Sequence, residues 1–201
     1  MSTDFKTSET KTNLMRAFAG ESQARGRYDF AAKAAGEQKL YVVEALFRFT
    51  AKQEQAHAKV FYDRLKAFDG GEIAADGSYP VNLTASVAGL LRSAAANERR
   101  EHDEVYAAFA ETAQREDFPE VAADFRNIAA IEQLHGERFT KFADLLESGK
   151  LFVADAECAW MCLNCGHVQT TKAAPELCPV CGHDRGFFIR LSMTPWGVEK
   201  G

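Results

Sequence analysis

Apolar residues recur at three- and four-residue steps along most of the chain before residue 149, and this spacing predicts amphipathic helices. Four long segments show it, at residues 12–35, 39–68, 82–115 and 117–148. We expect Gly36 and Gly70–Gly71 to end the first two helices. We expect Asn82 to cap the third helix, and Asp117 with Pro119 to begin the fourth. The pattern therefore predicts two helical hairpins.

The connection between the two hairpins is about 14 residues long, enough to stretch roughly 46 Å. A helix of about 28 residues is roughly 42 Å long, so this connection can return the third helix parallel to the second. That is the single long crossover of ferritin-like bundles. We therefore expect an all-α four-helix bundle of ferritin-like topology. The same connection could instead carry the third helix into a partner chain, and the sequence leaves both possibilities open.

Polar residues interrupt the apolar stripe of every predicted helix. Glu54 and His57 stand within the stripe of the second helix, and Glu132 and His135 repeat this Glu-x-x-His spacing in the fourth. A buried carboxylate is unfavourable unless a partner compensates its charge. The first and third helices carry the remaining interruptions: Glu21, Glu98 and Glu101.

The spacing of these residues indicates a duplicated hairpin. The interval from Glu21 to Glu54 is nearly the same as that from Glu98 to Glu132, which is one position longer. A His follows three positions after the second Glu of each pair. No Lys or Arg alternates with the acids on the buried faces, so salt bridges cannot neutralise all of them. Carboxylates from four helices with two Glu-x-x-His pairs predict a dinuclear iron or manganese site.

Three further residues are candidates for this site. Glu101 shares the face of Glu98 one turn earlier, which favours a ligand role; the alternative is a solvent-exposed acid within the charged run NERREHDE. Tyr28 and Tyr106 lie two turns beyond Glu21 and Glu98 on nearly the same face. Their hydroxyls either contact the ligand carboxylates or find another acceptor in the core.

A second metal site is predicted near the C-terminus. All five cysteines lie after residue 157, where Pro, Gly and β-prone runs replace the helical composition. Two Cys-x2-Cys knuckles, separated by the stretch GHVQTTKAAPEL, converge on one tetrahedral ion: Cys162, Cys165, Cys178 and Cys181. Zinc and iron both suit this spacing, and Cys158 is left over. We therefore expect a helical domain, residues 1–154, and a small β-rich metal domain, residues 155–201.

Charge and composition narrow the classes of partner that we expect this protein to bind. The net charge of −5 comes from interspersed acids and bases without a basic stripe, so we expect no nucleic acid partner. The N-terminus has no signal-peptide pattern, and no run approaches the roughly 20 apolar residues of a membrane span. We expect no membrane association and a cytoplasmic protein.

Together these motifs resemble the rubrerythrin family over nearly the whole chain. The matching stretches are AGESQARGRY, EQAH, ANERREHDEVY, EQLH, and WMCLNCG with CPVCG. The resemblance implies a diiron site and a rubredoxin-like iron held by the four paired cysteines. It assigns bridging roles to Glu54 and Glu98, one iron to Glu132 and His135, and a terminal position on the other iron to Glu21. On that second iron, Glu101 in the oxidised state would exchange with His57 in the reduced state.

The same resemblance implies a function. The diiron site would reduce hydrogen peroxide to water in protection against oxidative stress. Electrons would pass singly through the rubredoxin-like iron from an external rubredoxin or NAD(P)H-dependent reductase. The resemblance also implies a homodimer or higher homo-oligomer. Two alternatives remain: iron storage in a ferritin-like shell, and an oxygen-activating oxidase or metal sensor with zinc bound by the cysteines. The electron-transfer module argues against storage, because ferroxidation needs no returning electrons.

Overall fold

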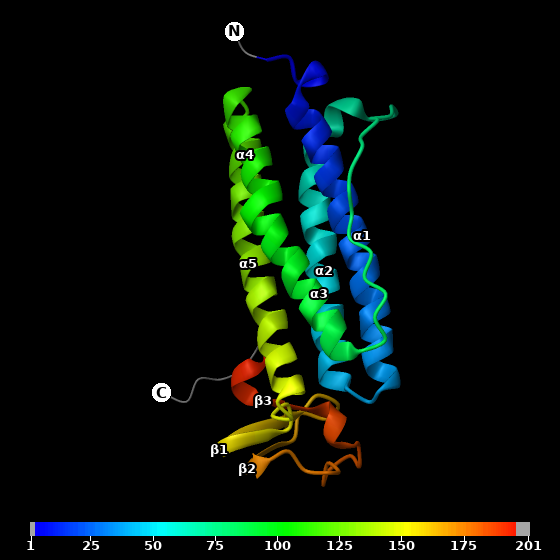
Figure 1. Ribbon diagram of the computed structural model, residues 1–201, viewed down its shortest axis with the longest axis vertical. Helices are drawn as coiled ribbons and strands as arrows, with labels where there is room; N and C mark the ends of the chain where they lie inside the picture. Colours follow the sequence, from blue (N-terminus) through cyan, green and yellow to red (C-terminus); the bar gives the residue numbers. More distant parts are fainter. Residues whose placement is uncertain (1–2, 196–201) are drawn as a thin grey trace.

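A computed structural model describes residues 3–195 and shows a long helical bundle with a small sheet at one end (Figure 1). The helices are α1 (Glu9–Glu37), α2 (Tyr41–Arg64), α3 (Val87–Arg100), α4 (Tyr106–Arg115) and α5 (Pro119–Glu147). A π-helical segment, Glu101–Val105, joins α3 to α4, so the two form one continuous third helix. The predicted four-helix bundle is confirmed.

Two serines set helix starts that the apolar pattern misplaced. Ser8 accepts a hydrogen bond from the Lys11 N–H at 3.1 Å and caps α1, which begins before residue 12. Ser86 accepts from the Gly89 N–H at 3.2 Å and caps α3, so Asn82 is not the cap. Serine is as good an N-cap as asparagine, so residue type alone did not distinguish Ser86 from Asn82. The first turn of α1 lies before the regular apolar stripe of that helix.

The helix ends follow the expected glycines only in part. α1 continues one residue beyond Gly36, and the left-handed residue after it is Lys39, with φ of 57°. α5 ends as predicted before Gly149, which has φ of 70°. Gly36 instead permits a close approach, because a Cβ there would lie 2.5 Å from a carboxylate oxygen of Glu44 on α2.

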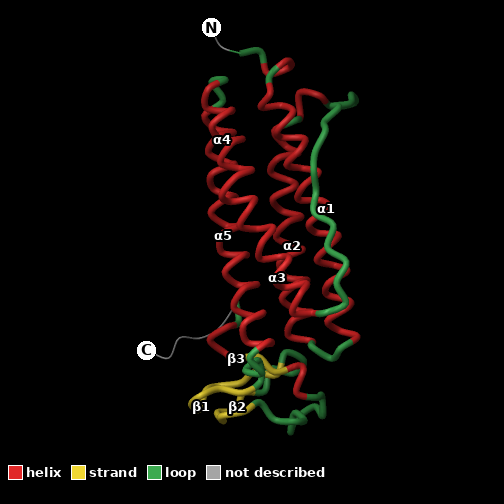
Figure 2. Tube along the Cα trace, in the orientation of Figure 1, coloured by secondary structure: helices red, strands yellow, loops and turns green. Residues whose placement is uncertain are grey.

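The crossover between the hairpins occupies residues 69–86 and runs the length of the bundle beside α1 (Figures 1 and 2). It returns the third helix parallel to α2, while α1 and α5 run the opposite way. The crossover is held on α1 by the Tyr79 hydroxyl, which donates to the Arg16 carbonyl at 3.2 Å, and by an ion pair of Arg16 with Asp76 at 2.6 Å. The topology is therefore ferritin-like, with the crossover completed within one chain.

The interior of the bundle consists of two apolar clusters separated by a polar layer. One cluster contains Phe47, Leu91 and Phe139, and the other contains Phe61 and Phe125. Along each long helix, the buried acid found in the sequence lies between residues of one cluster and residues of the other. The apolar clusters thus exclude water from both sides of the acids.

The small domain is an antiparallel sheet of order β2-β1-β3, formed by β1 (Val153–Cys162), β2 (Val168–Ala173) and β3 (Phe188–Arg190). Its core contains the fully buried Trp160 and Phe188. Phe187 stacks on Tyr41 with ring centroids 4.1 Å apart, which seats the sheet on the turn between α1 and α2. The expected domain boundary between residues 154 and 155 falls inside β1, and the division into two domains stays a prediction. The outer ends of the two predicted domains, residues 1–2 and 196–201, lie outside the described residues.

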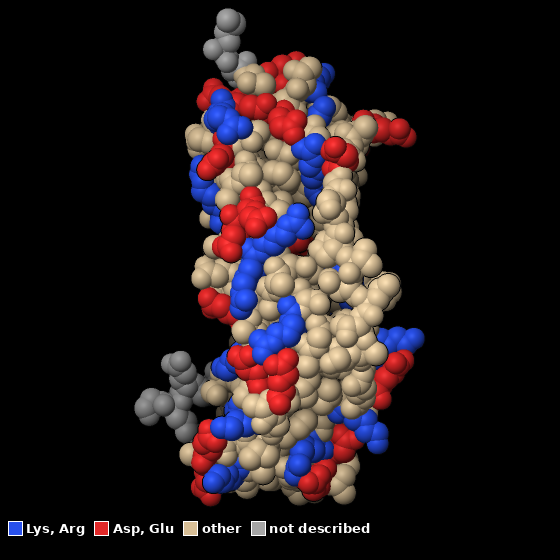
Figure 3. Space-filling view, in the orientation of Figure 1, with Lys and Arg blue, Asp and Glu red and all other residues tan. Residues whose placement is uncertain are grey.

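On the face shown in Figure 3, acidic and basic side chains are interspersed and no area of one sign dominates. Across residues 3–195, no helix combines the length and apolar character needed to cross a bilayer.

Candidate metal centres

Six of the predicted residues meet in the buried polar layer: Glu21 from α1, Glu54 and His57 from α2, Glu98 from α3, and Glu132 and His135 from α5. The Nδ1 atom of His57 lies 2.9 Å from one Glu132 oxygen and 3.7 Å from Glu21. The Nδ1 atom of His135 lies 2.8 Å from the other Glu132 oxygen and 3.7 Å from Glu98. The layer therefore brings together residues that lie far apart in the sequence, from Glu21 to His135.

These side chains form two adjoining groups that share two members. Within each group the candidate ligand atoms lie within 4.8 Å of one another. The groups are Glu21, Glu54, His57 and Glu132, and Glu54, Glu98, Glu132 and His135. The side chains therefore provide two adjacent cation positions that share two carboxylates.

The carboxylates that the two groups share differ from the bridging pair that the family resemblance implied. Glu54 and Glu132 belong to both groups, whereas Glu98 belongs only to the group of His135. Glu98 is thus the counterpart of Glu21, a carboxylate at one end of the site. The duplication itself requires this, because the repeat that maps Glu54 onto Glu132 maps Glu21 onto Glu98.

Two buried tyrosines close the site from opposite helices. The Tyr28 hydroxyl donates to Glu98, and the Tyr106 hydroxyl donates to Glu21. Each tyrosine therefore contacts the acid carried by the other helix, not the acid on its own. Burial raises the pKa of both phenols well above the usual value, and the neighbouring carboxylates add to this. Both remain hydrogen-bond donors at neutral pH.

The electrostatics show that the cluster needs positive charge at its centre. Burial raises the pKa of Glu21 and of Glu98 well above the usual range. Burial acts the same way on Glu54, but the imidazoles of His135 and His57, each 3.0 Å from a Glu54 oxygen, outweigh it and lower the Glu54 pKa to about 2. Burial disfavours the charged imidazoles, yet the carboxylates raise the pKa of His57 to about 12 and of His135 to about 11. Protons or metal cations can supply this charge.

Several buried ligand atoms lack a hydrogen bond of ordinary geometry within the described part of the chain. They are Glu21 Oε2, Glu54 Oε1, Glu98 Oε2, both Glu132 side-chain oxygens and His135 Nδ1. Buried polar atoms without partners are rare in folded proteins. All of these atoms belong to the two groups, and carboxylate oxygens with imidazole nitrogens suit iron or manganese. The residues present therefore fit a dinuclear metal site.

Glu101, the seventh predicted ligand, lies outside both groups and begins the π-helical segment. Glu54 and Glu132 lie the same number of residues after the first residues of α2 and α5. The third helix, however, has one more residue between Glu98 and its end than α1 has between Glu21 and its end. The extra residue of the second hairpin therefore lies in the third helix, where the π turn accommodates it. The unequal intervals between the paired acids were the signal in the sequence. Burial, with the charges of Glu132 and Glu54, raises the pKa of Glu101 to about 8.

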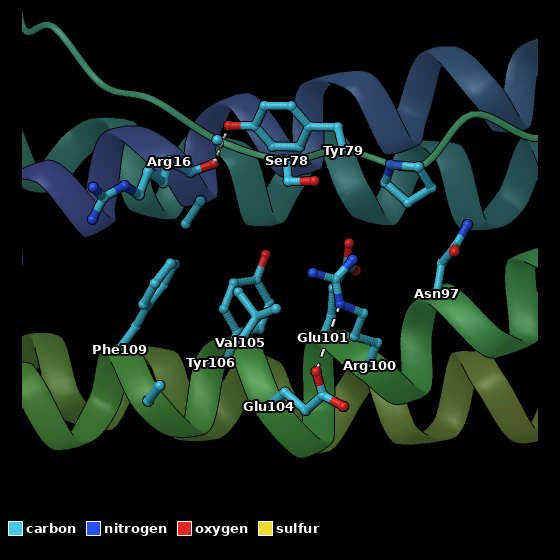
Figure 4. Close-up of a pocket in the computed structure, with 15 residues that line it drawn as sticks. Arg16, Ser78, Tyr79, Asn97, Arg100, Glu101, Glu104, Val105, Tyr106 and Phe109 are labelled. Atoms are coloured by element: carbon cyan, nitrogen blue, oxygen red, sulfur yellow. Dashed lines mark hydrogen bonds and ion pairs between the residues drawn. The ribbon is translucent and has the colours of Figure 1, made fainter.

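A cavity of about 290 Å³ lies between the crossover and the third helix, with Glu101 and Tyr106 in its wall (Figure 4). Tyr79 covers it from the crossover, and Gly20 and Arg16 line it from α1. Because Tyr106 also donates to Glu21, the cavity adjoins the Glu21 and His57 end of the cluster. The sequence did not predict this cavity, since it depends on where the crossover lies.

Gly136 has a packing role that the sequence left unexplained. A Cβ at this position would lie 3.4 Å from the Ala95 carbonyl oxygen and from the side chains of Glu98 and Arg99. The absence of a side chain lets α5 approach α3 closely beside Glu98. This places Glu98 within reach of His135.

The four paired cysteines converge as predicted. The sulfur atoms of Cys162 and Cys181 lie 3.8 Å apart, and those of Cys165 and Cys178 lie 3.6 Å apart. A tetrahedron with metal–sulfur bonds of about 2.3 Å has edges of about 3.8 Å, so the cage matches a tetrahedral ion. A hydrogen bond from the His183 backbone lowers the pKa of Cys181 to about 6. Cys158 lies outside the cage.

Comparison with known proteins agrees with both sites. Residues 12–143 match the family model for rubrerythrin, and residues 160–189 match the model for the rubrerythrin rubredoxin-like domain. The chain is 44% identical to a rubrerythrin of Porphyromonas gingivalis, over 94% of this chain and 92% of that protein. It is 37% identical to a rubrerythrin of Nitratidesulfovibrio vulgaris, over 94% of this chain and 97% of that one.

Solved structures agree on the fold. Fully reduced, all-ferrous nigerythrin superimposes with a TM-score of 0.62 and 26% identity, covering 94% of this chain and 92% of its own. A bacterioferritin of Mycobacterium tuberculosis superimposes with a TM-score of 0.62 and 17% identity, covering 74% and 90%. The second likeness concerns the fold of the bundle alone.

Proposed function

The chain belongs to the rubrerythrin family, and from this premise we propose that it reduces hydrogen peroxide to water. It carries a ferritin-like diiron site and a rubredoxin-like four-cysteine site. Hydrogen peroxide takes up two electrons and two protons to give two molecules of water. Iron bound in the bundle would supply the electrons for this reduction. The observation that carries the proposal is the two adjoining groups of buried carboxylates and imidazoles, which lie next to a cavity in the same chain as a four-cysteine cage.

The proposed ligand roles follow the two groups. Glu54 and Glu132 would be shared between the two irons, Glu21 and His57 would hold one iron, and Glu98 and His135 would hold the other. Tyr28 and Tyr106 orient the end carboxylates through their hydroxyls. The unpartnered ligand atoms support this assignment.

We assign Glu101 a role that alternates with His57. In this structure His57 belongs to a ligand group, while Glu101 faces the cavity from the π turn. A carboxylate entering in place of a neutral imidazole adds negative charge where oxidation adds positive charge. Such an exchange keeps the charge of the buried site nearly constant, which a low-dielectric interior favours.

The cavity beside Glu101 is the proposed entry route for peroxide. It is small, it is walled by Tyr79 and the third helix, and it leads to the Glu21 and His57 end of the cluster. Its volume of about 290 Å³ is ample for a molecule of the size of hydrogen peroxide.

The cysteine cage is the proposed entry point for electrons. Four thiolates saturate an iron, so such a centre transfers single electrons and binds no substrate. Cys165 is exposed, and the neighbouring Leu177 and Val180 are 62% and 67% exposed, which offers an external rubredoxin or NAD(P)H-dependent reductase a surface near the sulfur atoms. We propose a cytoplasmic homodimer or higher homo-oligomer as the working form.

Anaerobic stopped-flow mixing tests the function. Fully reduced, iron-loaded protein is mixed with stoichiometric hydrogen peroxide, and the visible absorption of the ferric thiolate centre is followed. Rapid return of this colour, faster than with dioxygen, is the expected result, because electrons then leave the cage for a peroxide-reducing site. Slow return, or return with dioxygen only, would reject the peroxidase proposal.

Metal content and particle size separate the two rival functions. The proposal requires about three irons per chain, two in the bundle and one in the cage. Zinc in the cage with iron in the bundle would instead favour an oxidase or a metal sensor. A cage-sized particle in light scattering would favour iron storage.

A further inference from the structure

The two imidazoles of the cluster are held differently on the side away from the carboxylates. The Nε2 atom of His135 lies 3.1 Å from Oε1 of Gln53, and Arg138 donates to the same oxygen at 3.3 Å. Among the described residues, Nε2 of His57 has no such partner. The His57 side chain is 8% exposed and that of His135 only 1%. One imidazole is thus anchored at its outer nitrogen and the other is not.

The Gln53 contacts determine the tautomer of His135. An arginine guanidinium only donates hydrogen bonds, so the Gln53 atom that faces Arg138 is the amide oxygen. An oxygen accepts, so Nε2 of His135 carries the hydrogen of the 3.1 Å contact. The lone pair of a neutral His135 is then on Nδ1, the atom that faces Glu54, Glu98 and Glu132.

The duplication shows that this anchor exists on one side only. Gln53 precedes Glu54, and the matching residue before Glu132 is Ile131. Arg138 follows His135 by three positions, and the matching residue after His57 is Val60. The two positions near His57 that correspond to the polar partners of His135 are therefore occupied by aliphatic residues. Neither side chain can accept or donate a hydrogen bond.

We propose that Gln53, fixed by Arg138, is a positioning residue that holds His135 as a permanent metal ligand, and that Ile131 and Val60 leave His57 free to exchange. The inference rests on the proposed diiron function for the meaning of the exchange. The anchor itself is a property of the folded chain. It explains how a duplicated and nearly symmetric site comes to act asymmetrically, with one mobile imidazole beside the cavity.

Nuclear magnetic resonance of the full-length, zinc-loaded protein with ¹⁵N-labelled histidine tests the anchor. We expect His135 to bind zinc through Nδ1 and to show a slowly exchanging Nε2–H, while the Nε2–H of His57 exchanges rapidly. Gln53→Met should speed the His135 exchange at least about tenfold and speed zinc loss to a chelator by about 10- to 100-fold. Gln53→Glu, which keeps an acceptor beside Arg138, should restore both. Gln55→Met, at an exposed position of the same helix, is the matched control.

A reciprocal variant tests the asymmetry. Ile131→Gln with Val60→Arg should give His57 a slowly exchanging Nε2–H, as Gln53 and Arg138 do for His135. Unchanged His135 exchange in Gln53→Met, or zinc bound through Nε2 in the unsubstituted protein, would overturn the proposal, and the second measurement needs no variant. The zinc protein performs no peroxide chemistry, so this result is independent of whether the iron protein reduces peroxide.

Discussion

Tyr106 donates its hydroxyl hydrogen to Glu21, and this bond joins the two halves of the duplicated bundle. Tyr28 and Glu98 form the reciprocal bond in the opposite direction. Both phenols are almost fully buried, and each lies at the boundary between the polar layer and one apolar cluster. The carboxylates of Glu21 and Glu98 are therefore each oriented by a tyrosine from the other hairpin. The sequence pattern of one hairpin alone does not reveal these pairs.

Removing the Tyr106 hydroxyl should weaken the fold without disturbing the core. Tyr106→Phe keeps the ring that packs on Phe61 and Phe125 but leaves a buried oxygen of Glu21 without a partner. We expect a loss of about 1 to 3 kcal/mol in the free energy of unfolding, measured by urea denaturation of the chelator-treated protein. Tyr62→Phe, whose side chain is 54% exposed, should change it by less than about 0.5 kcal/mol. Equal stability of both variants would contradict the hydrogen bond.

Glu101→Ala should retain two metal ions in the bundle but lose peroxide activity. Glu101 lies outside both ligand groups, so both cation positions keep four protein side chains. It faces the cavity and is the only proposed ligand that has no counterpart in the first hairpin. We expect metal analysis to be unchanged and the peroxide reaction rate to fall by about 10- to 100-fold. An unchanged rate would remove the exchange between Glu101 and His57 from the mechanism.

The sequence predicted the bundle well because its signals are local and repeated. Apolar periodicity located the four helices, and the displaced acids at matching positions located the polar layer. Six of the predicted ligands do meet there. The cysteine cage was equally predictable, because two Cys-x2-Cys knuckles at this spacing have few arrangements other than a shared tetrahedral metal site.

The sequence was less informative about relations between helices. Glu54 shares both groups with Glu132 and not with Glu98. This depends on how far each helix is shifted along its neighbour, which the periodicity of a single helix does not reveal. The π turn was present only as a one-residue difference in spacing. Gln53 and the cavity under Tyr79 were not predicted at all, since both arise where residues of different segments meet.

Filling the cavity should separate substrate access from metal binding. Gly20 lies in its wall, and a Cβ there would meet only the Tyr79 ring, at 3.8 Å. Gly20→Ala should therefore keep the peroxide rate, while Gly20→Leu should occupy part of the cavity and slow the second-order rate constant about tenfold or more. Both variants should bind the same amount of metal. If Gly20→Leu with normal metal content reacts at the original rate, peroxide does not enter by this route.

Stability toward acid should depend on Glu116. Its carboxylate accepts hydrogen bonds from the backbone N–H groups of Glu9 and Thr10, at 3.0 and 2.8 Å, in the first turn of α1. Partial burial opposes ionisation, but the bonds from Thr10 and Glu9 outweigh it and lower the pKa of Glu116 below the ordinary 4.5. A depressed folded-state pKa means that this stabilisation is present above pH 4.5 and disappears as the pH falls through the folded value.

Glu116→Gln should accordingly destabilise the protein by about 1 kcal/mol at pH 7, measured by urea denaturation. The difference from the unsubstituted protein should shrink as the pH is lowered below 4.5. Glu111→Gln, at an exposed position of α4, is the control and should leave the curve unchanged. A constant difference at all pH values would show that the carboxylate charge is not the stabilising feature.

Loss of one thiolate should uncouple the two metal centres without unfolding the bundle. Cys178 is almost fully buried and belongs to the small core around Trp160, so Cys178→Ala removes both a ligand and part of that core. We expect the chain to lose one metal ion and the thiolate absorption band, while far-ultraviolet circular dichroism of the helices is retained. The reduced bundle should still react once with peroxide, but turnover with an external electron donor should stop. Cys158→Ala, which lies outside the cage, should preserve the absorption band and turnover. Continued turnover in Cys178→Ala would mean that electrons reach the bundle by a path that bypasses the cage.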